Sequence, residues 1–188
     1  MMRDIPNYLR DAATLLTKDG FVTGNIWYHG TSSALVKSIK SNGLKRSGDK
    51  EMKQAANSTM ATIGNNYTES TEPVFLTQSK ELAYYWAEQT IRERGVRFDG
   101  EENAVVFAVE LPEEENTNVL PDVGAASLLM VKEGESYMAY VARIYQGCNA
   151  GVLDIDLMKA HRLEYLNKLG MAYINKDIGA EFISLVTR

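Results

Sequence analysis

The stretch around His29 combines residue types that suit a binding site for a polar ligand. His29 follows two aromatic residues and precedes Gly30, Thr31 and Ser32. Glycine lets a ligand approach the backbone closely, and hydroxyls and free amides at a helix start offer hydrogen-bond donors to an anionic group. An uncharged imidazole can also donate a hydrogen bond to a ribose hydroxyl. The competing interpretation is a histidine that only packs and satisfies its hydrogen bonds.

A second group of candidates is aromatic and lies in the segment PVFLTQSKELAYYWA, residues 73–87. Tyr84 and Tyr85 are adjacent in a predicted helix, so their side chains point about 100° apart. We expect at most one of them to share the core face of Trp86, with the other exposed or lining a cleft. Phe75 and Thr77 belong to the strand predicted just before this helix.

Two carboxylates are candidates for a charged group at such a site. Asp122 follows the apolar run Val-Leu-Pro and precedes a glycine, while Glu135 lies in the segment KEGESYMAY, and Gln146 is a further polar candidate. Spacing alone does not choose among them. No metal site is predicted, because the carboxylates lack EF-hand spacing and one cysteine, Cys148, cannot form a cysteine-based zinc site.

Length and composition predict one domain that spans residues 1–188. The net charge of −5 argues against nucleic-acid binding by bulk charge, although it leaves room for a local basic groove. A single cysteine excludes an intramolecular disulfide and favours a reducing compartment. With no secretory or membrane-spanning apolar segment in the sequence, we expect a cytoplasmic protein without membrane contact.

The alternation of β-like and helical segments predicts an α+β fold. β-rich runs predict strands at 25–30, 73–77, 104–111, 136–147 and 181–187. Apolar periodicity and capping residues predict helices at 6–20, 31–44, 79–95 and 154–170, with Ser79 as the N-cap of the third. Residues 1–20 would thus form an N-terminal helix and residues 154–188 a C-terminal helix and strand. The polar segment 45–72 is long enough to be a functional loop.

Three segments in this order resemble the NAD-binding core of the ADP-ribosyltransferase superfamily. They read WYHGTSSALVKSIKSNGL, EPVFLTQSKELAYYWA and AVVFAVELP, and together they reach from Trp27 to Leu111, about half of the chain. The similarity is to the histidine-first branch, which includes diphtheria-toxin-like enzymes, poly-ADP-ribose polymerases and rifamycin ADP-ribosyltransferases. RNA 2′-phosphotransferases are a more distant match, and EPVFLTQ lacks the basic residues that they would need. The resemblance implies one domain with split mixed or antiparallel sheets, flanking helices and an NAD cleft.

The resemblance also implies roles for the residues around His29. His29 matches the histidine that hydrogen-bonds a ribose of NAD, and Gly30 matches the backbone that grips the nicotinamide amide. Thr31 and Ser32 would lie near the adenosine side. Residues 45–72 would form the donor loop that covers NAD, which serves as co-substrate.

The remaining implied roles depart from the family pattern. Phe75 stands where many members have a tyrosine that stacks on nicotinamide, and phenylalanine keeps the ring without the hydroxyl. Tyr84 or Tyr85 could supply a second ring. Asp122 fits the acid of the rifamycin type, and Glu135 fits the glutamate of polymerase-like members. The implied catalytic set is therefore His29, Phe75, Tyr85, Asp122 and Glu135, and the implied NAD-binding set is His29, Gly30, Thr31, Ser32, Phe75, Thr77 and Tyr84.

The implied activity is NAD-dependent mono-ADP-ribosyl transfer to a protein or a nucleic acid, with release of nicotinamide. A small transferase of this kind fits a bacterial or phage toxin or effector, which leaves room for an inhibitor or antitoxin partner. A nucleic-acid acceptor stays open because basic residues cluster near the expected cleft, at Lys37, Lys40, Lys45, Arg46, Lys50 and Lys53. Two alternatives remain: a non-catalytic module that binds NAD, ADP-ribose or a partner, and a transferase that modifies a small molecule such as an antibiotic.

Overall fold

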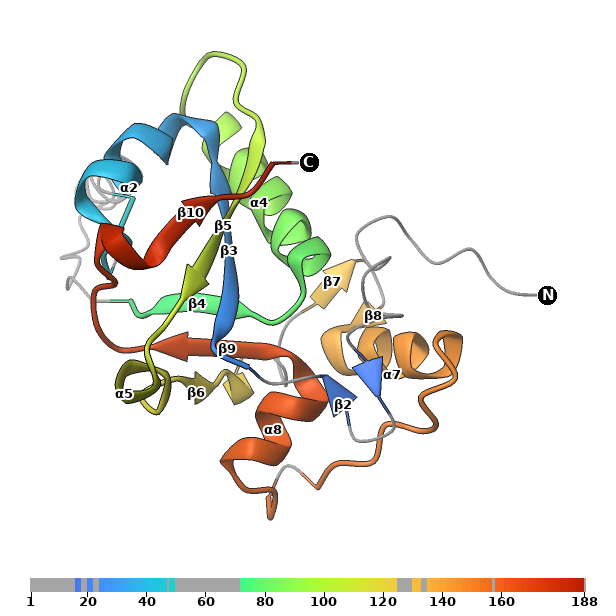
Figure 1. The fold of residues 1–188 in the computed structure, drawn as a ribbon. Helices are drawn as coiled ribbons and strands as arrows, with labels where there is room; N and C mark the ends of the chain where they lie inside the picture. Colours follow the sequence, from blue (N-terminus) through green and yellow to red (C-terminus); the bar gives the residue numbers. More distant parts are fainter. Residues whose placement is uncertain are drawn as a thin grey trace, which may run out of the picture.

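A six-stranded antiparallel sheet organises the computed structural model of the chain (Figure 1). The structure describes residues 16–17, 20–21, 24–46, 48–49, 72–124, 130–132, 135–156 and 158–187. Most of the predicted donor loop and of the predicted N-terminal helix therefore lies outside the described residues. The strand order is β10-β5-β3-β4-β9-β6. These strands are β3 Ile26–Ser32, β4 Val74–Thr77, β5 Ala104–Glu110, β6 Leu120–Pro121, β9 Met171–Ile174 and β10 Ile183–Leu185.

Helices and two small hairpins surround this sheet, which confirms the α+β class. The helical elements are η2 Ser33–Leu35, α2 Val36–Asn42, α4 Lys80–Gly95, α5 Glu113–Asn116, α7 Tyr137–Gly147, α8 Arg162–Leu169 and η3 Ala180–Phe182. The hairpins pair β1 Leu16–Thr17 with β2 Gly20–Phe21, and β7 Met130–Lys132 with β8 Glu135–Ser136. No helix in the described ranges combines the length and the apolar character that crossing a membrane requires.

The sheet consists of two halves that meet at one residue pair. β3 pairs with β5 along its whole length, and β4 pairs with β9 along its whole length. Between β3 and β4, in contrast, the only pair of the register is Tyr28 with Thr77. The halves β10-β5-β3 and β4-β9-β6 therefore separate on either side of this pair, and we call the line between β3 and β4 the seam.

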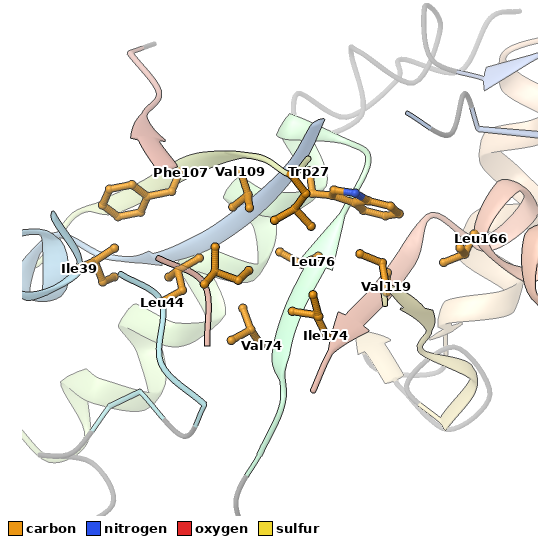
Figure 2. Close-up of a cluster of buried hydrophobic side chains, with 13 residues drawn as sticks. Trp27, Ile39, Leu44, Val74, Leu76, Phe107, Val109, Val119, Leu166 and Ile174 are labelled. Atoms are coloured by element: carbon orange, nitrogen blue, oxygen red, sulfur yellow. The ribbon is translucent and has the colours of Figure 1, made fainter. Parts of the chain in front are cut away.

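Each face of the sheet is covered by different elements. The larger core lies on the face that carries Trp27, Leu76 and Phe107, where α2 and the chain around Ile178 pack against both halves (Figure 2). On the opposite face α4 packs on β3 and β5, with Tyr84 in contact with the cluster around Val106. Side chains of successive strand residues point to opposite faces, which is why one short strand serves two cores.

α4 forms where the sequence predicts it. The Ser79 hydroxyl accepts a hydrogen bond from the backbone N–H of Leu82 at 3.0 Å, which satisfies a free amide of the first turn. The helix ends at Gly95, as expected.

The predicted strand at 136–147 is wrong, because this segment is the helix α7. Its buried residues are spaced by three and four positions, as a helix requires: Tyr137, Tyr140, Val141, Ile144 and Tyr145. Ser136 caps the helix by accepting from the Ala139 N–H at 3.3 Å. The tyrosines and β-branched residues gave the segment a strand-like composition, but its periodicity packs a helical face against α4, α8 and β2.

Three other predicted boundaries change. The helix predicted at 154–170 begins only at Arg162, because the Asp156 carboxylate accepts from the Met158 N–H at 2.9 Å and holds a turn there. The helix predicted from Thr31 begins after Ser32, since β3 runs on to that residue. Leu16–Thr17, predicted as helix, pairs with Gly20–Phe21 in a hairpin whose Phe21 packs into the cluster of α7 and α8.

Candidate functional site

The His29 imidazole reaches across the seam and bonds to β4. Its Nδ1 lies 2.8 Å from the backbone carbonyl oxygen of Phe75. A carbonyl can only accept, so Nδ1 carries the hydrogen of this bond. Burial lowers the pKa of His29, and the hydrogen bond to Phe75 offsets only part of this. The imidazole is therefore neutral near pH 7, and its Nε2 holds a lone pair.

This tautomer reverses the expected direction of the bond to a ribose. The sequence led us to expect that His29 donates to a ribose hydroxyl. Because Nδ1–H is already used, Nε2 can only accept from such a hydroxyl. Among the residues that the structure describes, the Phe75 carbonyl is the one hydrogen-bond partner of the ring.

His29 and the Phe75 ring do not share a face of the sheet. Alternation directs the Cβ of His29 to the face of Trp27, whereas Phe75 belongs to the same face as Thr77. The Phe75 side chain is 46% exposed, and it lies in register with Tyr173 and Leu120 on β9 and β6. Phe75 thus contributes its carbonyl to His29, while its ring faces the other side of the half-sheet.

Gly30 is a close-packing position for α4. A Cβ placed on Gly30 would lie 1.8 Å from the Ala83 carbonyl oxygen and 2.9 Å from the Ala87 nitrogen. The expectation from sequence was that the missing side chain lets a ligand approach. In the folded chain a helix backbone fills the space in which that side chain would lie.

Thr31 and Ser32 are buried rather than open to a ligand. The Ser32 hydroxyl donates to the Glu102 carboxylate and accepts from the Ala34 N–H at 3.1 Å. It thus caps η2 and ties the end of β3 to the segment before β5. These contacts leave Ser32 without a free donor for an adenosine ribose.

Thr77 and the tyrosine pair also have structural surroundings. The Thr77 hydroxyl donates to the Gly170 carbonyl at 2.7 Å and accepts from the Ser79 N–H at 3.2 Å. Tyr84 and Tyr85 are both buried, in different cores on the two sides of α4. The prediction that one of them is exposed or lines a cleft is therefore wrong, because the helix is covered over a wider arc than one face.

Neither candidate acid lies on β3 or β4, the two strands of the seam. Asp122 follows β6, and its N–H donates to the Met171 carbonyl at 3.1 Å. This adds Asp122 to the row Tyr28–Thr77–Met171, so three strand spacings, about 14 Å, separate its backbone from that of Tyr28. Glu135 lies in the β7–β8 hairpin and accepts from Arg143 through both carboxylate oxygens, at 3.1 and 3.2 Å.

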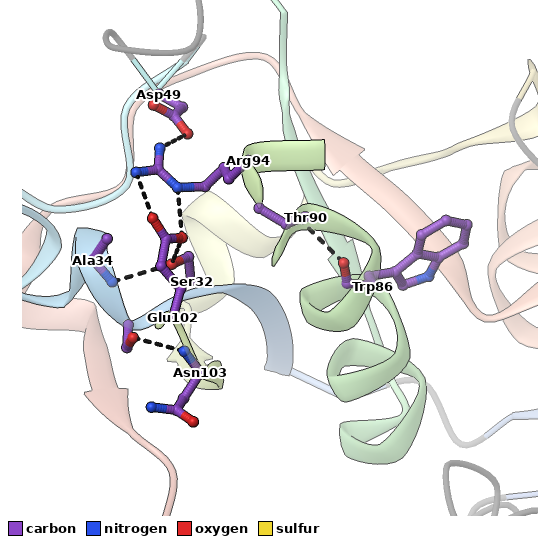
Figure 3. A network of polar contacts seen from close by, with 9 residues as sticks. Ser32, Ala34, Asp49, Trp86, Thr90, Arg94, Glu102 and Asn103 are labelled. Atoms are coloured by element: carbon purple, nitrogen blue, oxygen red, sulfur yellow. Dashed lines mark hydrogen bonds and ion pairs between the residues drawn. The ribbon is translucent and has the colours of Figure 1, made fainter. Parts of the chain in front are cut away.

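A buried ion network at the end of β3 was not predicted (Figure 3). Arg94 of α4 has a side chain only 3% exposed, and it bonds to Glu102 at 2.7 Å and to Asp49 at 2.5 Å. Its guanidinium also lies 4.7 Å from the centre of the Phe98 ring. Hydrogen bonding to Arg94, followed by that from Ser32, lowers the pKa of Glu102 against the opposing effect of its burial. The sequence signal was misleading, because Arg94 stands in a charged run typical of a solvated helix end.

The structure thus brings together His29 and the Phe75 carbonyl, and it disperses the other expected site residues. In the part of the chain that the structure describes, no group of three or more His, Cys, Asp or Glu side chains could hold a metal ion. The NAD cleft and the superfamily assignment remain predictions. Comparisons of the chain with family models, curated proteins and solved structures found no match.

Proposed function

We propose that the protein is an NAD-dependent mono-ADP-ribosyltransferase that acts on a macromolecular acceptor, a protein or a nucleic acid. The observation that carries the proposal is the state of His29. A neutral imidazole fixed by its Nδ1–H at the seam, with an Nε2 lone pair, suits a ribose hydroxyl that needs an acceptor. The order of motifs from Trp27 to Leu111 gives independent support.

In this reaction the protein mainly has to position the substrates, and proton transfer is less important. NAD supplies an ADP-ribosyl group whose bond from C1′ to the nicotinamide nitrogen breaks, and nicotinamide leaves with the bonding pair. A lone pair of the acceptor forms the new bond to C1′, and the acceptor loses a proton to solvent. His29 would orient the ribose by accepting one hydroxyl proton in a hydrogen bond, which fixes the geometry of the breaking bond.

Not every residue fits the role that the resemblance implies. His29 fits, whereas Thr31 and Ser32 are covered, so the adenosine part would have to bind elsewhere. Neither acid is placed to stabilise positive charge at a ribose held by His29. Glu135 bonds to Arg143 through both oxygens, and Asp122 lies in the row of Tyr28 and Thr77, which belongs to the face opposite to His29.

A second candidate function is a module that binds NAD or ADP-ribose without turnover. The observation that favours it is the distance of about 14 Å, three strand spacings, between the backbones of Asp122 and of Tyr28, the neighbour of His29. A site that holds a ribose but lacks a nearby carboxylate loses a major source of stabilisation for an oxocarbenium-like transition state.

Incubation with labelled NAD and a cell lysate tests the proposal. The lysate is separated afterwards into protein, RNA, DNA and small-molecule fractions, and released nicotinamide is quantified. We expect label in one macromolecular fraction. Label in the small-molecule fraction alone would point to an antibiotic-type transferase. NAD binding without released nicotinamide would establish the binding module instead.

The control variant must separate the ligand role of His29 from its structural role. His29→Asn keeps an N–H donor near the position of Nδ1, so it can still bond to the Phe75 carbonyl, but it has no counterpart of Nε2. We expect His29→Asn to stay folded and to lose transfer. Full transfer by this variant would show that Nε2 has no part in the reaction.

A further inference from the structure

Positive charge is concentrated on α2 and the turn that follows it. Residues 37–46 contain Lys37, Lys40, Lys45 and Arg46 and no acidic residue, in a chain whose net charge is −5. All four side chains are exposed. We call these four residues the basic face.

The helical part of the basic face presents its charges on one side. Lys37 and Lys40 are three residues apart in α2, so they are neighbours on the helix surface. Ile39 anchors the opposite side in the larger core. The other exposed positions of the helix are small and polar, namely Ser38, Ser41 and Asn42.

The turn after α2 is fixed to the body of the protein. Leu44 and Ile178 exchange two backbone hydrogen bonds, at 2.8 and 2.9 Å. Gly43 has φ 77°, and a Cβ there would lie 2.0 Å from the Ile178 carbonyl oxygen, so this close approach requires glycine. The turn therefore holds the next two residues, Lys45 and Arg46, in defined positions.

Asp177 organises these two cations without cancelling them. Its carboxylate accepts from the Arg46 N–H at 2.9 Å and lies 3.5 Å from Lys45 Nζ and 3.9 Å from Arg46 Nε. One carboxylate between two cations leaves a net positive charge at the turn. Both cationic side chains remain more than two fifths exposed, at 48% for Lys45 and 43% for Arg46.

We propose that the basic face binds the phosphate backbone of a nucleic acid. None of the exposed large apolar side chains of the described chain lies between residues 36 and 46. A protein partner usually needs an apolar or aromatic centre, and a membrane surface needs apolar side chains to insert, whereas phosphates need only cations and small polar donors. That the bound nucleic acid is also the acceptor of ADP-ribose depends on the proposed transferase function. That the basic face binds nucleic acid does not depend on it.

Fluorescence anisotropy with a labelled single strand of about 20 nucleotides, as DNA and as RNA, tests binding without NAD. Each phosphate contact contributes a slope of about 0.7 to the dependence of log K on log salt for single strands. Lys37→Gln with Lys40→Gln should therefore lower the slope by about 1.4 and weaken binding about 25-fold at about 0.1 M salt. A double-stranded probe shows whether the preference extends to duplexes.

The control is Lys80→Gln with Lys159→Gln, which removes the same charge from outside the basic face. Lys80 begins α4 on the opposite face of the sheet, and Lys159 is 84% exposed in the turn before α8. We expect this variant to bind as the wild type does. The proposal would be overturned if both double variants lost affinity equally, or if the wild type did not bind the strand at low salt. It would also be overturned if the wild type bound polyglutamate or anionic vesicles as tightly as the strand. If NAD is added and the bound strand stays unmodified, the binding proposal stands and only the nucleic acid as acceptor of the proposed transferase is refuted.

Discussion

Replacing Gly30 by alanine tests the closest contact between α4 and the sheet. The added Cβ would lie 1.8 Å from the Ala83 carbonyl oxygen, and Cβ atoms essentially never approach another heavy atom closer than 3.0 Å. The helix backbone must therefore move by more than an ångström. Ala83 and Val106 are fully buried in one cluster, so this movement disturbs a packed core.

The expected cost is at the upper end for overpacking, about 3 kcal/mol. For a chain of 188 residues this lowers the melting temperature by roughly 6 to 12 °C. Urea denaturation followed by circular dichroism measures the free energy of unfolding, and a thermal scan measures the midpoint. Gly95→Ala is the matched control, because nothing lies within 4 Å of a Cβ at Gly95, at the end of the same helix.

Gly95→Ala should leave stability unchanged or raise it by up to about 1 kcal/mol, since alanine has the higher helix propensity. If Gly30→Ala unfolds within about 2 °C of the wild type, α4 does not lie against β3 as described. In that case the space beside Gly30 would be open, as the sequence alone suggested for a ligand.

Three further predictions concern buried ionisable groups. Arg94→Gln leaves Asp49 and Glu102 without their cation and should lower the free energy of unfolding by about 3 to 5 kcal/mol in urea denaturation, whereas a change below about 1 kcal/mol would mark an ordinary surface pair. The pKa of Glu102 is lowered in the folded state, so its contribution to the free energy of unfolding is present above the unfolded pKa and is lost as pH falls. Glu102→Gln should therefore flatten the dependence of stability on pH between about pH 5 and 3, and an unchanged dependence would contradict this. The pKa of His29 is also lowered, so as pH drops below 6.5 the imidazole is protonated in the unfolded chain before it is protonated in the folded one, and stability falls. His29→Asn should remove this part of the dependence of stability on pH, and a dependence that stays the same would refute a neutral His29.

The helix α4 was predictable because local signals agree with its packing. Ser79 supplies the cap and Gly95 the end, and apolar residues recur at helical spacing between them. Residues 136–147, which contain α7, were predicted as a strand because their residue types favour strands, although their spacing favours a helix. In that conflict the spacing decides, because it determines which side chains can be buried together.

The site was less predictable than the fold, for reasons that single residues show. A glycine beside a histidine suits a ligand and a packed helix equally well, and only the position of Ala83 distinguishes them. The partners of Arg94 could not be found from spacing either, since Asp49 is 45 positions away in the chain. The sequence singled out His29 as a candidate, but the direction of its hydrogen bonds depends on the Phe75 carbonyl across the seam.

The most direct measurement is the ¹⁵N NMR spectrum of the His29 ring with and without NAD. The chain has two histidines, so a His161→Gln variant assigns the signals. We predict a protonated Nδ1 and an unprotonated Nε2 near pH 7, and a shift of the Nε2 signal when NAD is added. A protonated Nε2, or an Nε2 signal that does not respond to NAD, would contradict the proposed site.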